Sequence, residues 1–169
     1  MNLEEAREFL HSKMQSVNLR RHCYAVSAVM GALALRLGEK DKVEQWRIAG
    51  LLHDTIEDGG AKREDIAEQF GEDAALLVDG VTKVSELRLK GSTQNVFVES
   101  LRKMILVMAH DLRVVLIKLA DRYHNMNTLS FLPLEKQKRI AKETMEVYAP
   151  LAERLGIGEM KGKLEDLAF

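Results

Sequence analysis

The segment LLHDTIEDGG, residues 51–60, places four ionisable side chains at the end of an apolar stretch. These are His53, Asp54, Glu57 and Asp58. Imidazole and carboxylate groups at this spacing can bind a divalent cation or exchange protons with a substrate. A buried apolar helix does not tolerate such charges unless something compensates them. The segment therefore indicates a site that binds a charged group.

Two other segments direct similar side chains towards the interior. His22 precedes Val26 by one helical turn and continues the apolar face of a helix expected at residues 19–37. Asp121 lies on a half-apolar, half-polar face of a helix expected at 112–129. Ligands brought together by packed helices are an established way to build a metal site, and mixed imidazole and carboxylate sets suit manganese, iron, zinc or nickel. The predicted metal ligands are His22, His53, Asp54 and Asp121.

Glu57 and Asp58 follow the predicted ligands directly. A divalent metal lowers the pKa of a coordinated water towards neutrality. One nearby carboxylate can take the proton of this water, and a second can protonate a leaving group. We therefore predict that Glu57 and Asp58 are catalytic. Without a metal, the same pair would be read as a solvated helix end.

The helix that carries Asp121 offers further polar groups. Lys118, Asn125 and Thr128 share its inner face and could hold phosphate or sugar oxygens. An ion pair with an acid on a neighbouring helix is the alternative for Lys118. We expect His124 to make a hydrogen bond to a ligand, and Arg122, one position round the helix, to face outwards.

Helical spacing recurs along the chain, which contains only two prolines and little alternation of the β type. We therefore expect one all-α domain over residues 1–169. Pro150 is expected to kink or break the last helix. The helices are expected at residues 3–14, 19–37, 42–54, 62–71, 72–84, 96–110, 112–129 and 133–155, with a mobile loop at 85–95.

The composition narrows the class of protein. The 169 residues carry a formal net charge of −1, which gives no support to nucleic-acid binding. The apolar stretches are shorter than the ~20 residues that span a membrane. Cys23 is the single cysteine, and the N-terminal MNLEEAREFL does not resemble a signal peptide. We therefore predict a cytoplasmic protein that binds neither nucleic acid nor membrane.

Several segments carry a family resemblance. LLHDTIED, IAEQFGEDAALLVDGVTKVSEL, RKMILVMAHDLRVVLIKLADRYHNMNTL and EKQKRIAKETMEVYAPLAERLGI resemble the hydrolase domain of the RelA/SpoT homologues, within the HD superfamily of metal-dependent phosphohydrolases. The resemblance covers roughly residue 46 to the C-terminus. It implies an all-α HD fold and an Mn²⁺-dependent enzyme that removes the 3′-pyrophosphate of the alarmone (p)ppGpp, giving GDP or GTP. It also implies the same four ligands, Glu57 and Asp58 as the water-activating pair, and Asn125 and Thr128 in a nucleotide pocket.

The segment before His22 departs from that family. MQSVNLRRHCYAVSAVMGAL lacks the Gly-Glu-Pro-Tyr type loop that usually precedes the first histidine. Arg20 or Arg21 is our candidate for stacking on the guanine base. Two alternatives stay open, namely an HD hydrolase of another nucleotide such as a dNTP or NADPH, and a non-catalytic module that binds the alarmone.

The end of the sequence resembles a connection to a further domain. Residues 156–169 resemble the segment that leads into the synthetase domain of long family members. A synthetase domain in a longer chain is therefore a possible partner, beside the guanine nucleotide substrate. The sequence leaves the oligomeric state open.

Overall fold

The computed structural model describes residues 2–88, 106 and 111–169, with the side chains of 86–88 excepted. All regular structure in these residues is helical, which confirms the expected all-α class. None of the described helices is both long enough and apolar enough to span a membrane. The α-helices are α1 Leu3–Lys13, α2 Val17–Arg36, α3 Val43–Leu52, α4 Arg63–Arg88, α6 Leu112–Asn127, α7 Leu134–Glu143, α8 Ala149–Arg154 and α9 Gly158–Ala168.

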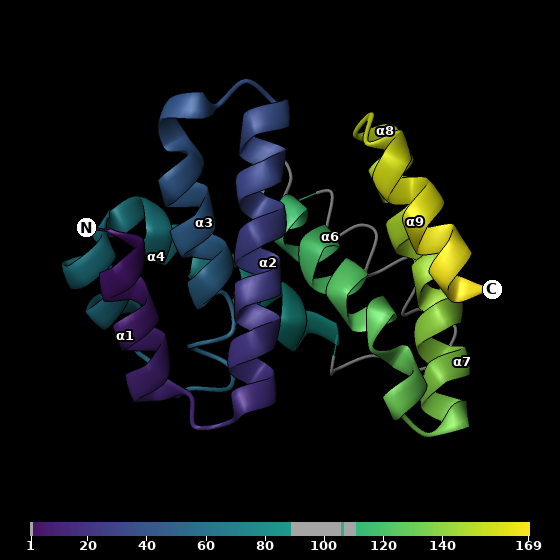
Figure 1. The fold of residues 1–169 in the computed structure, drawn as a ribbon, viewed down its shortest axis with the longest axis horizontal. Helices are drawn as coiled ribbons and strands as arrows, with labels where there is room; N and C mark the ends of the chain where they lie inside the picture. The colour runs from purple at the N-terminus through teal and green to yellow at the C-terminus, as the bar shows by residue number, and fades with distance from the viewer. Residues whose placement is uncertain (1, 89–105, 107–110) are drawn as a thin grey trace.

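Helix α6 runs through the middle of the molecule, with α1, α2 and α3 on one side and α7, α8 and α9 on the other (Figure 1). Two groups of buried apolar side chains join these helices. One group includes Phe9, Leu52 and Phe70 and joins α1 to α3 and α4. The other includes Met30 and Ile117 and extends from α2 across α6 to α8 and α9. Because α6 is packed on both sides, the polar residues on it are held in fixed positions.

The helix boundaries near α4 agree only in part with expectation. Gly71 adopts φ 84° and ψ 161°, so the expected break between two helical segments is present within α4. The prediction of a loop at residues 85–95 is wrong for its first residues, because α4 continues to Arg88. Buried Val84 and the hydrogen bond between Ser85 and Lys118 of α6 hold this end of the helix.

Other expectations in this region lie outside the described residues. These are the remainder of the loop, residues 89–95, and the helix expected at 96–110, apart from Leu106, which is helical. His110, which belongs to that expected helix, also lies there.

The C-terminal region contains a change of helical type. The expected single helix is divided into α7, a π-helical turn at Thr144–Tyr148, and α8. Pro150 is the second residue of α8. Proline cannot donate the backbone hydrogen bond of a regular helix, and its ring crowds the carbonyl four residues earlier. The π turn directly before α8 accommodates both effects, so the expected break occurs ahead of Pro150.

Helix α9 was not expected from the sequence. It buries Met160 and Leu164 against the rest of the core. Ile157, Met160, Leu164 and Leu167 follow helical spacing, so the pattern was present in the sequence. We had assigned this stretch to a connection instead.

Helices α2 and α3 approach each other closely at Gly50. A Cβ atom added there would lie 2.9 Å from Met30 Cγ and 3.2 Å from Ser27 Cα. We predict that Gly50→Ala lowers the free energy of unfolding by about 1–3 kcal/mol, because the two helices must separate. Urea denaturation measures the change.

Gly162→Ala is the matched control for this substitution. A Cβ atom at Gly162 in α9 meets nothing within 4 Å, and alanine favours a helix over glycine by about 1 kcal/mol. We expect this variant to be as stable as the parent or more stable. Equal losses in the two variants would contradict the close approach at Gly50.

Arg113 links the start of α6 to α4. Its two terminal nitrogens each lie 2.7 Å from a carboxylate oxygen of Asp73. Asp111 also pairs with Arg113 and caps α6, since it accepts a hydrogen bond from the backbone N–H of Arg113 at 2.8 Å. The hydrogen bonds from Arg113 lower the pKa of Asp73, although partial burial acts in the opposite direction.

The lowered pKa of Asp73 gives a pH dependence of stability. The contribution is present above the unfolded-state pKa of about 3.9 and is lost as the pH falls through the folded-state value. We predict that Asp73→Asn costs about 1 kcal/mol or less at neutral pH, because the carboxylate is half exposed. Urea titrations at several pH values should show the difference shrinking below about pH 4. A difference that stays constant in acid would contradict this role.

Candidate metal centre

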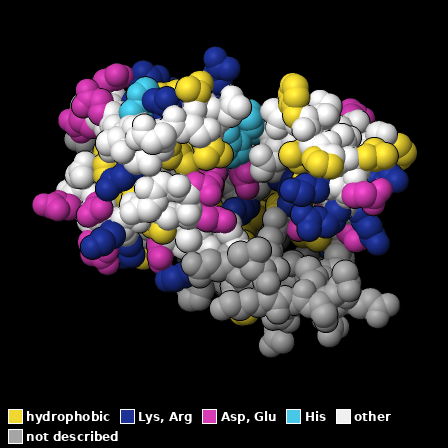
Figure 2. Space-filling model, turned by 90° about the horizontal axis from the view of Figure 1, so that it is seen from below, with side chains coloured by type: hydrophobic (Ala, Val, Ile, Leu, Met, Phe, Trp, Pro, Cys, Tyr) yellow, Lys and Arg dark blue, Asp and Glu magenta, His cyan; other side chains and the backbone are white. Residues whose placement is uncertain are grey.

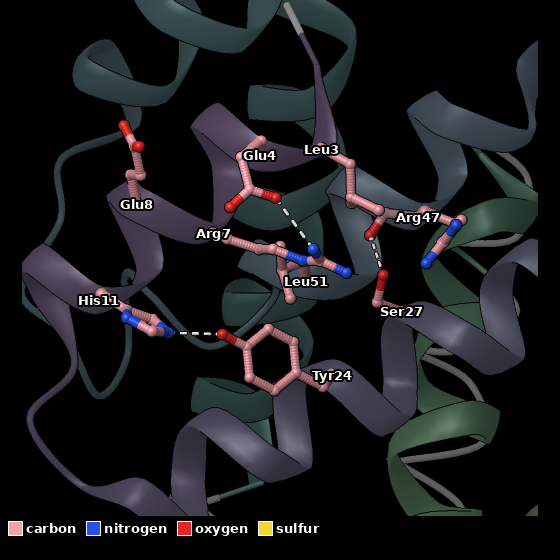
Figure 3. A pocket seen from close by; sticks show the side chains of 9 residues that line it. All are labelled: Leu3, Glu4, Arg7, Glu8, His11, Tyr24, Ser27, Arg47 and Leu51. Carbon is pink, nitrogen blue, oxygen red and sulfur yellow. Dashed lines mark hydrogen bonds and ion pairs between the residues drawn. The ribbon is translucent and has the colours of Figure 1, made fainter.

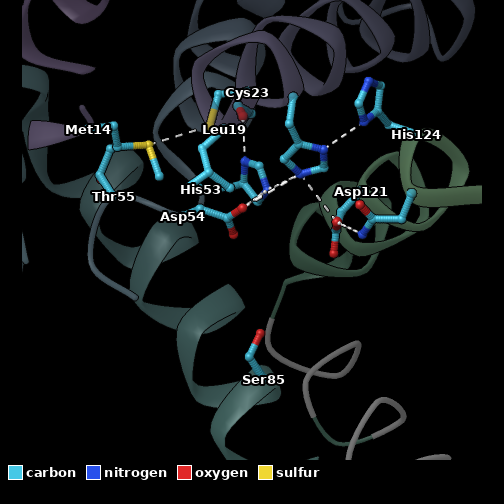
Figure 4. A network of polar contacts seen from close by, with 12 residues as sticks. Met14, Leu19, Cys23, His53, Asp54, Thr55, Ser85, Asp121 and His124 are labelled. Carbon is cyan, nitrogen blue, oxygen red and sulfur yellow. Dashed lines mark hydrogen bonds and ion pairs between the residues drawn. The ribbon is translucent and has the colours of Figure 1, made fainter. Parts of the chain in front are cut away.

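The four predicted ligands come together where α2, the end of α3 and α6 meet. His22 Nε2 lies 3.3 Å from His53 Nε2, 3.5 Å from Asp54 Oδ2 and 3.4 Å from Asp121 Oδ1. His53 Nε2 lies 3.0 Å from Asp54 Oδ2. Figure 4 shows His53, Asp54 and Asp121 directed towards a common space. The predicted convergence is therefore present, while metal binding by these residues stays a prediction.

The end of α3 presents His53 and Asp54 in a fixed turn. The backbone N–H and the hydroxyl of Thr55 both donate to the carbonyl of Leu52, at 2.9 Å and 2.7 Å. The backbone N–H of Asp58 donates to the carbonyl of Asp54 at 2.8 Å. These bonds fix the backbone on both sides of the two residues, whose side chains lie 3.0 Å apart between His53 Nε2 and Asp54 Oδ2.

The hydrogen bonds of His53 determine which of its nitrogens faces the cluster. His53 Nδ1 lies 2.8 Å from the carbonyl oxygen of Gly50. A carbonyl only accepts, so Nδ1 carries the hydrogen, and in the neutral ring Nε2 presents a lone pair. Nε2 faces the carboxylate of Asp54 and the ring of His22, so it donates a hydrogen to Asp54 when the ring is charged and presents a lone pair when the ring is neutral.

His124 makes the corresponding contact to His22. The two Nδ1 atoms lie 2.8 Å apart, which confirms the expected hydrogen bond from His124 to a predicted ligand. Burial and the charge on His22 lower the pKa of His124, so its ring is held neutral and can accept. With His22 Nδ1 as the donor to His124, His22 Nε2 faces the cluster, and in the neutral ring it presents a lone pair there.

The donor set fits a divalent cation. Two imidazole lone pairs and two carboxylates face one another across 3.0–3.5 Å. His53 is fully buried and His22 is 8% exposed, so water cannot offset their mutual repulsion. A group of ligand atoms from His22, His53 and Asp121 lies within 4.8 Å. The residues present therefore match the requirements of a nitrogen and oxygen site.

Protons stabilise the cluster in the absence of a cation. Burial alone would lower the pKa of His53, but the charge and hydrogen bond of Asp54 raise it well above its usual value. Burial would raise the pKa of Asp54, but the charge on His53 lowers it. Burial would also raise the pKa of Asp121, which the hydrogen bond to His22 and the charge on Lys118 lower. Both carboxylates are thus held ionised and require positive charge beside them.

The predicted catalytic pair follows Asp54 within one turn of the chain, and the backbone N–H of Asp58 bonds the carbonyl of Asp54. Glu57 and Asp58 are both exposed. Partial burial raises the pKa of Asp58, and the charge on Asp54 raises it further, which places Asp58 within electrostatic reach of the ligands. Glu57 has no side-chain partner among the described residues. The catalytic role of both residues stays a prediction.

Two of the predicted substrate-binding residues contact Asp121 directly. Asn125 Nδ2 donates to Asp121 Oδ1 at 2.6 Å. Lys118 Nζ lies 3.5 Å from Asp121 Oδ2 and donates to Ser85 Oγ at 2.6 Å. Both side chains therefore orient the carboxylate. The hydroxyl of Thr128 lies one helical turn further along, 3.3 Å from the carbonyl oxygens of His124 and Asn125.

The predicted base-stacking residues directly precede His22 on α2. Arg20 donates to the carbonyl oxygen of Gln15 at 3.4 Å, and Arg21 is exposed. Neither side chain makes a hydrogen bond or ion pair with the four predicted ligands in the part of the chain that the structure describes. Their role towards a base stays a prediction.

The expectation that Arg122 faces outwards was wrong. Arg122 is 6% exposed, and its Nη2 lies 2.8 Å from Glu143 Oε2. The guanidinium carbon lies 4.2 Å from the ring centroid of Tyr148. These partners follow α6 in the chain and fold back over it, which the spacing within α6 could not reveal.

Ser85, the hydrogen-bond partner of Lys118, was missed for a similar reason, because the sequence predicts a loop at this residue.

The cluster reaches the surface near the middle of one face. Figure 2 shows histidine and acidic side chains lying close together there. The side chains of Asp54 and Asp121 are 14% and 17% exposed, so a ligand from solvent can contact them.

A separate hollow of about 410 Å³ lies between α1, α2 and α3 (Figure 3). It is lined by residues that include Arg7, Tyr24 and Arg47, and His11 bonds the hydroxyl of Tyr24 at its edge. A second hollow of about 590 Å³ is lined by residues that include Trp46 and Arg113. Neither lining contains a predicted ligand, so the candidate site is defined by the cluster.

The bond between His124 and His22 generates a testable expectation. We predict that His124→Leu lowers the affinity for Mn²⁺ by about 10–100-fold, because the tautomer and orientation of His22 are no longer fixed. Isothermal titration calorimetry measures the affinity. His11→Leu, the same change on an exposed residue outside the cluster, should leave it unchanged. Unchanged affinity in His124→Leu would show that His22 is oriented by packing alone.

Comparison with known proteins adds evidence independent of this geometry. The sequence matches the family model of the HD domain over residues 3–158, which include all four predicted ligands. A protein of Haemophilus influenzae named guanosine-3′,5′-bis(diphosphate) 3′-pyrophosphohydrolase is 55% identical over 122 residues, which are 72% of this chain and 18% of that protein. The protein of that name in Aquifex aeolicus is 50% identical over 137 residues, which are 81% of this chain and 19% of that protein.

A further relative carries a different name. A GTP pyrophosphokinase of Myxococcus xanthus is 53% identical over 135 residues, which are 79% of this chain and 18% of that protein. The chain thus spans about a fifth of the length of these relatives. The names confirm the resemblance to (p)ppGpp-metabolising proteins that the sequence indicated. Because the family model covers most of the chain together with its His and Asp cluster, the chain belongs to the HD domain family.

Proposed function

We propose that this chain hydrolyses the alarmone (p)ppGpp, removing its 3′-pyrophosphate and leaving GDP or GTP. The observation that carries the proposal is the buried convergence of two imidazoles and two carboxylates from three parts of an HD domain. Relatives named as 3′-pyrophosphohydrolases of this alarmone support the choice of substrate. Relatives named as pyrophosphokinases match the chain as well, and hydrolysis is favoured because the cluster suits attack by water.

The proposed cofactor is Mn²⁺, held by the four predicted ligands. A mixed set of imidazole and carboxylate suits this ion, and the family resemblance favours it over other divalent metals. When bound, a divalent ion would lower the pKa of a water molecule and neutralise negative charge on the phosphoryl oxygens. The ligands are His22, His53, Asp54 and Asp121.

The remaining steps belong to the side chains around the cluster. Asp58 accepts a proton from the attacking water, whose oxygen forms a bond to phosphorus. The bond from that phosphorus to the 3′ oxygen breaks, and Glu57 supplies the proton that the 3′ oxygen requires. Lys118, a buried cation beside Asp121, offsets charge on the phosphoryl oxygens.

We assign recognition of the nucleoside to residues at the end of α6 and near the start of α2. Asn125 of α6 and Thr128, which caps the end of that helix, follow Asp121 at helical spacing and can bond sugar oxygens. Arg20 or Arg21 would stack on guanine. A cytoplasmic location and a synthetase domain in a longer chain are part of the proposal and rest on the sequence.

Product analysis tests the proposed reaction. We would incubate metal-stripped protein with ppGpp, with and without Mn²⁺, in parallel with GTP, dGTP and NADPH. Anion-exchange chromatography should show GDP and pyrophosphate from ppGpp alone, and only when Mn²⁺ is present. Asp54→Asn should abolish turnover, because it weakens a ligand. Hydrolysis of another nucleotide would show that ppGpp is not the substrate. Binding of ppGpp without product would indicate a regulatory module that does not catalyse the reaction.

The role of Asp58 predicts a pH effect on the rate. A base must be ionised, and the pKa of Asp58 is raised by burial and by Asp54, so the wild-type rate should fall as the pH drops through that raised value. We predict that Asp58→Asn lowers kcat by about 10²–10⁴-fold and removes this acid limb. Asp166→Asn, the same change on an exposed residue of α9, should keep both the rate and the profile. An unchanged profile in Asp58→Asn would assign the proton transfer elsewhere.

A further inference from the structure

A thiol lies against the candidate metal centre and has no part in the proposed reaction. Cys23 follows His22 directly on α2 and is fully buried. Ligand atoms of Cys23, His53 and Asp54 all lie within 4.8 Å of one another. Figure 4 shows Cys23 next to His53, with Met14 beyond it. The structure thus contains a second group of potential ligands, one of them sulfur.

The two groups overlap but are not the same. Both contain His53, and Asp54, a predicted ligand of the first centre, lies 3.0 Å from its ring. They differ in two ligands, since the first group takes His22 and Asp121 and the second takes Cys23 and Asp54. Because His53 and Asp54 can hold one ion at a time in either position, occupation of one centre excludes the other.

The contact of the thiol with Met14 is easily replaced. Cys23 Sγ lies 3.9 Å from Met14 Sδ, and a thiol is a weak donor to a thioether. Exchange of this contact for a metal–sulfur bond therefore costs little. The close packing of α2 on α3 at Gly50 keeps the sulfur near His53.

We propose that Cys23, His53 and Asp54 form a second cation site, selective for thiophilic divalent ions such as Zn²⁺ or Cd²⁺. Thiolate ligands favour these ions over Mn²⁺, which prefers oxygen and nitrogen. Zinc binds sulfur at about 2.3 Å and imidazole nitrogen at about 2.0–2.1 Å, distances that modest side-chain rotations reach from the present arrangement. Binding displaces the thiol proton to solvent and leaves a thiolate on the metal.

Binding of a metal at the second site prevents complete binding at the first centre. Zn²⁺ at the second site withdraws His53 and Asp54 from the position between His22 and Asp121. Mn²⁺ then cannot bind there with its full set of ligands. Zinc is therefore an inhibitor that acts through Cys23, and Mn²⁺ and Zn²⁺ compete although their sites are not identical.

X-ray absorption at the zinc edge tests the site on the unaltered protein. One equivalent of Zn²⁺ is added to metal-stripped protein. We expect one sulfur neighbour at about 2.3 Å beside nitrogen and oxygen. A shell of nitrogen and oxygen alone would overturn the proposal. This measurement does not involve turnover, so its result tests the second site independently of the proposed reaction.

Variants identify the sulfur. Met14→Leu conserves volume and should retain the sulfur neighbour, and so should His22→Ala, because neither residue belongs to the second site. Cys23→Ser should remove it. A sulfur neighbour that persists in Cys23→Ser, or is lost in Met14→Leu, would assign the bond to the thioether and overturn the proposal. If Cys23→Ser does not fold, retention of the sulfur neighbour in Met14→Leu excludes the thioether that contacts the thiol, and the cobalt measurement below then decides.

Cobalt provides a second, optical measurement. Co²⁺ bound to a thiolate gives an intense charge-transfer absorption in the near ultraviolet, which nitrogen and oxygen ligands do not give. We expect this absorption in the parent and in His22→Ala, its loss on addition of equimolar Zn²⁺, and its absence in Cys23→Ser. Absence of the absorption in the parent would contradict the site.

Discussion

The arrangement of the molecule depends on one electrostatic constraint, the meeting of two imidazole lone pairs and two carboxylates in a place with little water. His53 is fully buried and hydrogen-bonded through Nδ1 to a carbonyl, so its Nε2 must face the carboxylate of Asp54. His22 is held in the same sense by His124. Such a group is unfavourable without positive charge in its centre. Protons meet this requirement in part, and a divalent cation meets it fully.

The helices around the cluster are arranged so that this constraint can be met. Gly50 allows α2 to approach α3, which brings His22 to the end of α3. The hydrogen-bonded turn after Leu52 fixes the backbone that carries His53 and Asp54. Helix α6, packed on both sides, supplies Asp121. Each of these features positions a charged or polar side chain of the cluster. Packing of the helices alone would not require these side chains, so their burial indicates a function rather than a contribution to stability.

Local patterns in the sequence were sufficient for most of the helices and for the convergence of the four predicted ligands, because both depend on a spacing of about 3.6 residues. His22 was found by extending an apolar face, and the acids near His53 by their position at a helix end. Contacts between distant segments could not be found in this way. The burial of Arg122 depends on Glu143 and Tyr148, and the proximity of Cys23 to Asp54 depends on the angle between two helices. Helix α9 was missed although its spacing was present, because its resemblance to a connecting segment was given more weight.

The nature of the ion and its ligands is the central question, and electron spin echo modulation of Mn²⁺ addresses it most directly. One equivalent of Mn²⁺ would be added to metal-stripped protein prepared with ¹⁴N-histidine and with ¹⁵N-histidine. We expect modulation from two directly bound histidine nitrogens that changes with the isotope, and loss of one of them in His22→Ala. Mn²⁺ with oxygen ligands alone, or no bound Mn²⁺, would contradict a metal centre built from His22 and His53.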